Sequence, residues 1–333
     1  MDTGFSRRGL FGAGAAAAAI LAGAPATARA ASGMAGSGMA GSGMAGSEMT
    51  GSEMTGSEMT LRWWGNNGWE IRIGPKTVLI DPWLTRFRTG TYTPAGADPR
   101  TPLSVNRALI DGYLDRGFLR ADHILVTHGH YDHLTDVPYL AERTGATVIG
   151  TETHLSLMAA MGAPEDQLAI ATGGEDLAFD GYSIRVLRSL HSATGGRAQV
   201  AFPGTRPLSR RDRPRVISDL LEGGTLAYLV SGGGASVLDF GGSNYVESEL
   251  AGLRPDVVLL PPGGAKVREY VPRLLRTVGD PRWVAATHWD DFDLPLGQAH
   301  DPNGGVEVLR KAVAAASPGS EFVVLDHLGE FTP

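Results

Sequence analysis

Short hydrophobic runs, separated by turn-forming residues, follow one another along the chain from Leu61 onward. The first stretch, LRWWGNNGWEIRIGPKTVLIDPW (61–83), alternates apolar and polar residues and is interrupted by GNNG and GP, a pattern typical of consecutive antiparallel strands. Later runs predict further strands at 123–128, 147–151, 182–191, 225–232, 235–242, 256–264, 283–289 and 322–327. Helix-period segments are predicted between several of them, at about 134–143, 153–162, 246–253, 266–278 and 304–316.

The order of these elements indicates the fold class. Hairpins come first and strands then alternate with helices, which favours an α+β protein of stacked sheets with helices outside. A chain of 333 residues, 42% of them hydrophobic, has material for one large domain or two small ones. We interpret 61–333 as a single domain. Ligand-type residues at several strand ends are expected to form a site along one edge of the sheets.

The N-terminal segment has the organisation of an export signal. Arg7 and Arg8 precede an apolar run and a small-residue cleavage sequence at 28–30. These features predict a twin-arginine signal over 1–30 that engages the twin-arginine translocase and is then removed. The apolar run is too short for a comfortable membrane span, so we expect a soluble periplasmic or extracellular protein with no stable membrane anchor. An uncleaved anchor is the alternative.

Residues 31–60 are interpreted as a linker. Within them a five-residue unit repeats, with methionine at 34, 39, 44, 49, 54 and 59. Gly, Ser and Thr dominate the repeat, so it cannot bury enough apolar surface to offset its ordering entropy, and we expect a disordered tether. The alternative is that the spaced thioethers bind Cu(I), which soft sulfur ligands select.

Charge and cysteine content narrow the classes of function. The formal net charge is -7, and no block of Lys and Arg is interleaved with aromatic residues, which argues against a nucleic-acid partner. Cysteine is absent, so disulfides and thiolate zinc sites are excluded. Any transition-metal site must therefore be built from imidazole and carboxylate groups.

The sequence THGHYDHLTD (127–136) concentrates such groups in a predicted loop between a buried strand and a helix. His128 and His130 are two apart in extended backbone, so their side chains project to the same side and can hold one ion. Asp132 and His133 come at the turn into the helix and face a neighbouring position. One short segment is thus predicted to serve two metal ions.

This H-x-H-x-D-H run resembles the signature of the metallo-β-lactamase superfamily, and the resemblance extends from about Leu61 to the C-terminus. It implies a four-layer αββα sandwich with one or two metals at the sheet edge. LRWWGNNGWEI, LIDPW, LLPPGG and THWDDF together are similar to the branch of ascorbate-6-phosphate lactonase and N-acylphosphatidylethanolamine phospholipase D. Within LIDPW, the resemblance implies that Asp81 is structural and holds the site loop by hydrogen bonds. Asn66 is a departure, because this branch usually carries histidine there.

The resemblance also implies metal ligands from later strands. His191 would complete the first metal site and His288 the second. The family's two metals share a carboxylate, but GGS (241–243) stands where Gly-Asp-Thr is expected. Asp239 would supply this bridging ligand only if its strand ended sooner or bulged; otherwise Ser243 or the asparagine after it faces the metals. Without a bridging anion the cations repel more strongly, so one bound metal or unequal occupancy is expected.

Together these motifs imply an exported metal-dependent hydrolase acting on an ester, lactone or phosphodiester bond. One or two Zn²⁺ ions suit the ligand set, with Mn²⁺ or Fe as alternatives. A bound ion lowers the pKa of water to roughly 7 and so supplies a nucleophile. Asp132 is the expected catalytic residue, because a ligand that also accepts a hydrogen bond from this water would orient it. A non-catalytic envelope metal-binding or sensor protein on the same fold is the alternative.

Weaker candidates for contacts with a small-molecule substrate lie near these positions. The segment TRPLSRRDRPR (205–215) is rich in arginine, and Arg210 and Arg211 in a lid over the site would favour an anionic substrate. A solvated loop is the alternative for this segment. Tyr131 lies beside ligand positions and is expected either to shape the pocket or to pack plainly. The remaining histidines are interpreted as surface or core residues; they are His123, His154, His300 and His327.

Overall fold

The computed structural model describes residues 58–194 and 196–333. The predicted export signal and all but the last residues of the predicted linker lie outside these ranges, and both stay predictions. Within the described part of the chain, no helix combines the length and apolar character needed to cross a bilayer.

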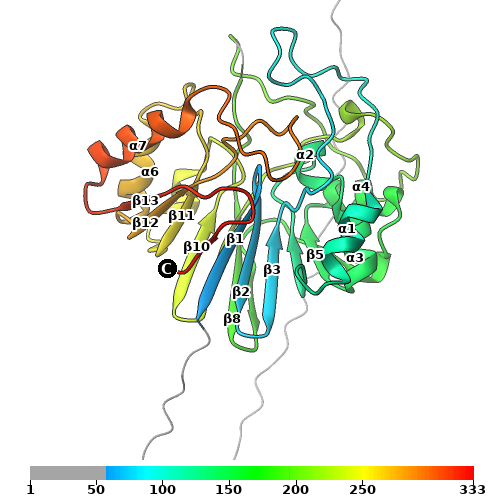
Figure 1. Cartoon of the computed structure of the whole chain (residues 1–333), viewed down its shortest axis with the longest axis horizontal. Helices are drawn as coiled ribbons and strands as arrows, with labels where there is room; N and C mark the ends of the chain where they lie inside the picture. The colour runs from blue at the N-terminus through cyan, green and yellow to red at the C-terminus, as the bar shows by residue number, and fades with distance from the viewer. Residues whose placement is uncertain (1–57, 195) are drawn as a thin grey trace, which may run out of the picture. The chain divides into compact units, whose positions relative to one another are not determined.

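Two seven-stranded sheets pack face to face in the described residues (Figure 1). The first sheet has the order β14-β1-β2-β3-β4-β5-β6 and the second β13-β12-β11-β10-β9-β8-β7. The strands of the first sheet are β1 (Met59–Gly65), β2 (Gly68–Ile73), β3 (Lys76–Ile80), β4 (His123–Leu125), β5 (Thr147–Gly150), β6 (Leu168–Ile170) and β14 (Glu330–Phe331). Those of the second are β7 (Asp176–Phe179), β8 (Tyr182–Arg188), β9 (Leu226–Gly232), β10 (Ala235–Asp239), β11 (Val257–Leu260), β12 (Trp283–Ala286) and β13 (Glu321–Val323).

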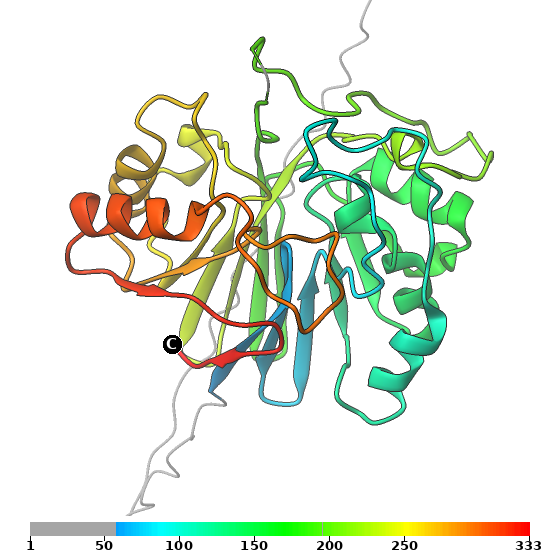
Figure 2. The same cartoon turned by 45° about the horizontal axis from the view of Figure 1, so that its top comes forward.

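Each sheet changes from antiparallel to parallel pairing part-way across. β1, β2 and β3 form the predicted hairpins, and β3 to β6 are parallel. β7 to β10 are antiparallel, and β10 to β13 are parallel. The carboxyl ends of parallel strands meet at one edge of a sheet, so the segments that follow β3, β4, β10 and β12 gather at the same end of the sandwich (Figure 2).

Helices cover the outer face of each sheet, which gives the predicted four layers. α1, α3 and α4 lie outside the first sheet, and α6 and α7 outside the second (Figures 1 and 2). Their bounds, with those of two short helices near the strand ends, are α1 (Arg107–Leu114), α2 (Tyr131–Leu134), α3 (Val137–Thr144), α4 (Glu152–Met161), α5 (Glu247–Leu250), α6 (Tyr270–Val278) and α7 (Gly305–Ala316).

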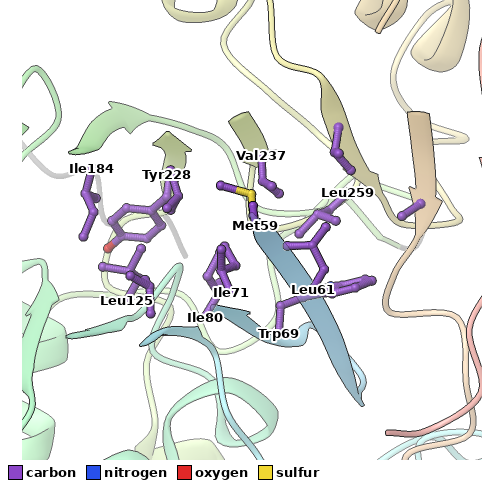
Figure 3. Close-up of a cluster of buried hydrophobic side chains, with 14 of the residues drawn as sticks. Met59, Leu61, Trp69, Ile71, Ile80, Leu125, Ile184, Tyr228, Val237 and Leu259 are labelled. Carbon is purple, nitrogen blue, oxygen red and sulfur yellow. The ribbon is translucent and has the colours of Figure 1, made fainter. Parts of the chain in front are cut away.

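The main core lies between the sheets and follows from the period-two alternation of the strands. In β1, Met59 and Leu61 point inward against Val237 and Leu259 of the opposite sheet (Figure 3). Residues at the intervening positions of central strands pack outward under the helices, as Val258 does. Strands buried on both faces explain the near-continuous apolar runs that made them recognisable in the sequence.

Every strand and helix predicted from the sequence has a counterpart, whereas β6, β7, β14 and α1 were missed. β6 and β7 are short edge strands with few buried residues, so they lack the apolar run that marks a central strand. α1 buries only Ile110 fully, so its sequence carries a weak apolar pattern. The formation of such elements depends more on tertiary contacts than on the pattern of apolar residues in their own sequence.

The folded region also begins slightly earlier than expected. β1 starts at Met59, whose side chain is 1% exposed in the core between the sheets. The last methionine of the repeat therefore belongs to the hydrophobic core, and its thioether is not available to an exposed copper site. Nothing in this observation bears on the earlier repeats.

Replacing Met59 by Ala is expected to lower the free energy of unfolding by about 2–5 kcal/mol, because it leaves a cavity between the sheets. Urea unfolding measures the difference. Glu58→Ala, at an exposed neighbour, is the control and should shift stability by no more than about 0.5 kcal/mol. Equal stability of the two variants would contradict the placement of Met59.

Candidate metal centre

Three histidines converge where β4 and β8 end. His128 and His130 follow β4, and His191 follows β8 in the opposite sheet. One ring nitrogen from each lies within 4.8 Å of the other two. The ring centroids of His128 and His191 are 4.5 Å apart, and those of His130 and His191 are 4.6 Å apart. We call this set the first triad.

A second set, the second triad, consists of Asp132, His133 and His288, again with ligand atoms within 4.8 Å of one another. Asp132 and His133 belong to α2, and His288 follows β12. The carboxylate oxygen Oδ2 of Asp132 lies 3.4 Å from Nε2 of His133 and 3.3 Å from Nε2 of His288. One carboxylate thus faces two imidazole nitrogens.

The segment that holds Asp132 and His133 is helical, which differs from the predicted loop. The single helix expected at about 134–143 is replaced by α2 and α3, with a break at Thr135 and Asp136. The Asp136 carboxylate accepts hydrogen bonds from the backbone of Leu84 and Thr85, each 2.7 Å long, and so ties the break to the loop after β3. These tertiary contacts fix the end of α2. The sequence of its four residues alone did not predict a separate helix.

The two triads abut without sharing a residue. The ring centroids of His128 and His133 are 3.8 Å apart, so a ring of the first triad packs directly against a ring of the second. One short segment, 128–133, thus contributes residues to both of these neighbouring sets. The binding of metal ions by these residues stays a prediction.

Each ring of the first triad has one nitrogen engaged by the protein. Nδ1 of His128 lies 3.1 Å from the hydroxyl of Thr127, Nε2 of His130 donates to the carbonyl of Ala201 at 2.8 Å, and Nδ1 of His191 donates to that of Ser192 at 2.8 Å. Such partners fix ring orientation and tautomer, and they leave the other nitrogen with its lone pair toward the centre. This is the arrangement that an imidazole metal ligand requires.

His133 provides the sharpest test of whether a cation fits. Its Nδ1 lies 2.7 Å from Oδ2 of Asp81, while its buried Nε2 has no hydrogen-bond partner among the described residues. A buried polar atom without a partner costs free energy, so such an atom in a native site calls for a ligand. An ion held by the second triad would satisfy it. The donor set therefore fits a divalent metal.

The electrostatic environments of the triads differ. Burial lowers the pKa of His128, His130 and His191, with a further contribution from neighbouring imidazoles, and the pKa of His130 falls to about 3. These rings are neutral at physiological pH, which is the ligating form. Burial opposes the charge of His133 as well, but the carboxylates of Asp132 and Asp81 raise its pKa to about 10. Positive charge is therefore favoured at the second triad.

Asp81, directly after β3, holds the segment that carries the triads. Its carboxylate accepts the backbone N–H of Thr127 at 2.8 Å and the side-chain amide of Asn67 at 2.8 Å, and it bonds to the Thr127 hydroxyl and to His133. The residue is fully buried, with a positive φ of 43°. The hydrogen bonds confirm the structural role that the sequence indicated.

Asn66 connects the two halves of the second triad. Its side-chain amide donates to the carbonyl of Asp132 at 2.6 Å, and its own carbonyl accepts the backbone N–H of His288 at 2.8 Å. The residue is buried in the turn between β1 and β2 with φ 50°, a conformation that asparagine tolerates better than most residues. The sequence showed only that a histidine was absent here and gave no sign of this role.

Behind Asn66 lies a buried charged cluster that sequence reasoning missed. Asp290 accepts the backbone N–H of Asn66 at 2.8 Å and bonds to Arg86 and His327. Although burial opposes its ionisation, hydrogen bonding by His327 and the charge of Arg86 lower the pKa of Asp290 to about 2. These three residues come from distant parts of the chain, so no local spacing could have revealed them.

Comparison with known proteins agrees with this architecture. Residues 60–276 match the family model described as a beta-lactamase superfamily domain. The chain belongs to the beta-lactamase superfamily. The crystal structure of the metallo-beta-lactamase fold protein YhfI from Bacillus subtilis superposes with a TM-score of 0.52 at 14% identity, covering 83% of this chain and all of that one. The predicted metallo-β-lactamase fold is therefore confirmed.

Two sequence relatives from Pyrobaculum carry the description UPF0173 metal-dependent hydrolase. The protein of P. arsenaticum is 28% identical over 78% of this chain and 97% of its own length. That of P. islandicum is 33% identical over 41% of this chain, and the match spans only 52% of that protein.

Within this superfamily, the chain departs at the position expected to bridge two metals. β10 ends at Asp239, but that carboxylate belongs to neither triad. It accepts the backbone N–H of Gly241 at 2.7 Å and the side-chain amide of Asn67 at 2.9 Å. Burial and the charge of Asp81 raise its pKa to about 7. Asp239 thus shares the side-chain amide of Asn67 with Asp81, and its role as a bridging ligand stays a prediction.

The residues after Asp239 pack against the loop that carries His191. A Cβ added to Gly242 would lie 2.9 Å from the hydroxyl of Ser192, so a side chain there requires that hydroxyl to move. The backbone N–H of Ser243 donates to the same hydroxyl at 2.8 Å, and Asn244 donates to the carbonyl of His191 at 3.3 Å. Both residues therefore support the His191 loop.

The weaker substrate candidates are engaged elsewhere. Arg210 pairs with Asp212 and Arg211 with Glu165, all on the surface. The Tyr131 side chain is buried, bonds through its hydroxyl to Thr91 at 2.9 Å and packs edge-on against aromatic neighbours. Its placement matches the plain packing that was one of the two expectations.

The lone histidines divide between surface and interior, as expected. His300 is exposed, and His123 bonds to the hydroxyl of Tyr182 at 2.7 Å. His154 is buried and caps the start of α4 through Thr151. His327 is an interior residue with a specific partner, because it belongs to the buried cluster with Asp290 and Arg86 described above.

Replacing Asp81 by Asn should weaken metal binding by about 10–100-fold, since Asn cannot accept from both Thr127 and His133 as the carboxylate does. Competition titration of Zn²⁺ against a chromophoric chelator measures the change. Asp98→Asn, at an exposed loop position, is the matched control. Unchanged affinity in the Asp81 variant would show that its hydrogen bonds do not orient the ligands.

Asp239 should make stability depend on pH. Its pKa is about 7 in the fold and about 3.9 in an unfolded chain, so the folded state binds the extra proton between these values. The contribution is present below about pH 4 and is lost as pH rises toward 7. Urea unfolding of chelator-treated protein from pH 4 to 8 measures this slope. Asp239→Asn should flatten it, and parallel profiles for the two proteins would refute the assignment.

Proposed function

We propose that the protein is a metal-dependent hydrolase whose two triads hold one or two divalent metal ions. The observation that carries this proposal is the pair of abutting triads, each with its ligand atoms within 4.8 Å of one another, together with the buried Nε2 of His133, which makes no hydrogen bond among the described residues. The relatives described as metal-dependent hydrolases support the same activity class. Zn²⁺ suits the nitrogen and oxygen ligands best, with Mn²⁺ or Fe as alternatives.

The triads are proposed to bind metal unequally. The first consists of three neutral imidazoles, and the second combines two imidazoles with the Asp132 carboxylate. No carboxylate of the described residues is shared by the two, so two cations would repel each other with less compensation than a bridging anion provides. We therefore expect one ion to bind more tightly than the other.

Asp132 is proposed as the catalytic residue. When bound, a metal ion acidifies water and polarises the substrate. Asp132 would accept a hydrogen bond from the attacking water at Oδ2, orient it and hold its proton until the leaving group takes it. Asn66 keeps this carboxylate in place by binding the Asp132 backbone. His191 and His288 are the partly exposed members of the triads, so substrate is expected to approach from their side.

The bond cleaved is proposed to be an ester, lactone or phosphodiester. The similarity of the strand-end motifs to the lactonase and phospholipase D branch supports this choice. The N-terminal motif supports export through the twin-arginine translocase to the periplasm or beyond. A folded precursor would suit that route, because both triads draw residues from distant strands.

A second candidate is a metal-binding or sensor protein without catalysis. The observation that favours it is the absence of a bridging carboxylate between the triads of the described residues. Metal content alone does not distinguish the two functions, whereas chelator-sensitive hydrolysis does.

The proposed function is tested by Asp132→Ala in an assay with p-nitrophenyl esters, lactones and bis-p-nitrophenyl phosphate. We expect kcat/KM to fall by at least about 100-fold while circular dichroism stays unchanged. Asp180→Ala, at an exposed turn, is the control. Wild-type protein should lose activity with a chelator and regain it with Zn²⁺. Stoichiometric metal without chelator-sensitive hydrolysis would favour the sensor, and full activity of Asp132→Ala would refute its catalytic role.

A further inference from the structure

A cavity of about 520 Å³ lies apart from the triads, between α3, the end of α4 and two extended segments at 103–107 and 213–215. None of its lining residues belongs to either triad. The volume falls in the range of small-molecule sites. It is therefore a second hollow in which a small ligand can bind, and the three arginines that line it are exposed.

Three guanidinium groups line this cavity, from Arg107, Arg213 and Arg215, against the single carboxylate of Glu142. In the described ranges none of the three has an ion-pair partner, although arginines close by do. The arginine-rich segment singled out in the sequence thus contains two arginines paired with carboxylates, Arg210 and Arg211, and two that line the cavity, Arg213 and Arg215. Uncompensated positive charge in a concave site attracts anions.

Most of the other lining residues are apolar. Leu103, Val105, Pro138 and Met161 line the cavity together with the ring of Tyr139. The guanidinium of Arg107 lies 4.6 Å from the centre of that ring, which holds the cation at the boundary between the charged and apolar parts. A ligand that matches both parts carries an anionic group on a compact apolar body.

The rim is held by backbone contacts and not by side chains alone. The N–H of Leu103 donates to the carbonyl of Arg215 at 2.9 Å, and Pro102 and Val216 form an antiparallel bridge. The two arginine-bearing segments are therefore fixed to each other before any ligand arrives. A preorganised site loses less conformational entropy on binding.

We propose that this cavity is an accessory site for an organic anion, a carboxylate or phosphate with a short apolar or aromatic body. The guanidinium groups bind the anionic group, and the apolar residues contact the rest. The site lies behind α2: Thr135 lines the cavity, and its hydroxyl donates to the carbonyl of Tyr131 at 2.6 Å. The proposal does not depend on the metal centre or on hydrolysis.

The experiment is calorimetric titration of the full-length protein with 2-naphthoate, its neutral analogue 2-naphthamide, and inorganic phosphate. We expect saturable binding of 2-naphthoate and at least tenfold weaker binding of the amide and of phosphate, because each lacks one of the two features. Arg213→Gln/Arg215→Gln should weaken naphthoate binding at least tenfold. Val105→Trp should also abolish it, since the indole fills the cavity while the arginines remain.

Arg185→Gln/Arg282→Gln is the matched control, because it removes the same charge from exposed arginines of the second sheet. This variant should keep the wild-type dissociation constant within about twofold. Equal weakening by both double variants would reduce the effect to net charge and overturn the proposal. Naphthoate binding unaffected by Val105→Trp and by Arg213→Gln/Arg215→Gln would assign it to another site, such as the triads, and would also overturn it.

Discussion

At the end of β3, the buried carboxylate of Asp81 accepts hydrogen bonds from the chain after β4, from the turn between β1 and β2, and from the ring of His133. A buried carboxylate is costly unless its lone pairs are all engaged, so these partners are constrained as strictly as the carboxylate itself. The constraint reaches both triads, because Thr127 also contacts His128 while His133 belongs to the second triad. The positions of the candidate ligands therefore follow from the satisfaction of one buried charge.

Each triad combines residues from both sheets. The segment after β4 supplies two members to each, and the second sheet completes them with His191 and His288. An ion bound at either triad would consequently join the two sheets at the edge where their strands end. Binding energy of this kind adds to the free energy of unfolding, because the separated chain segments of an unfolded protein offer no such site.

The polar residues behind the triads form two groups, one around Asp290 and one around Asp81 and Asp239. Asp290 forms a buried network with Asn66, Arg86 and His327, in which the guanidinium of Arg86 matches its charge. Asp239 is buried beside the carboxylate of Asp81, and burial together with that neighbouring negative charge raises its pKa, although the amide of Asn67 donates to both carboxylates. The first arrangement holds Asn66 in place, and the second links Asp239 to Asp81 through Asn67.

Local sequence determined the strands, most helices and the concentration of ligand-type residues at 127–136, because burial of alternate positions and the spacing of His128, His130, Asp132 and His133 are properties of neighbouring residues. The order of strands, with the resemblance to a known family, was sufficient to predict the fold. Only the tertiary structure decided that Asp132 and His133 stand on a short helix, that Asp239 and Asp81 share the amide of Asn67, and that His327 joins Asp290 and Arg86. These outcomes depend on contacts between residues far apart in the chain, such as Asn66 with Asp290, where hydrogen bonding and buried charge, not local periodicity, select the arrangement.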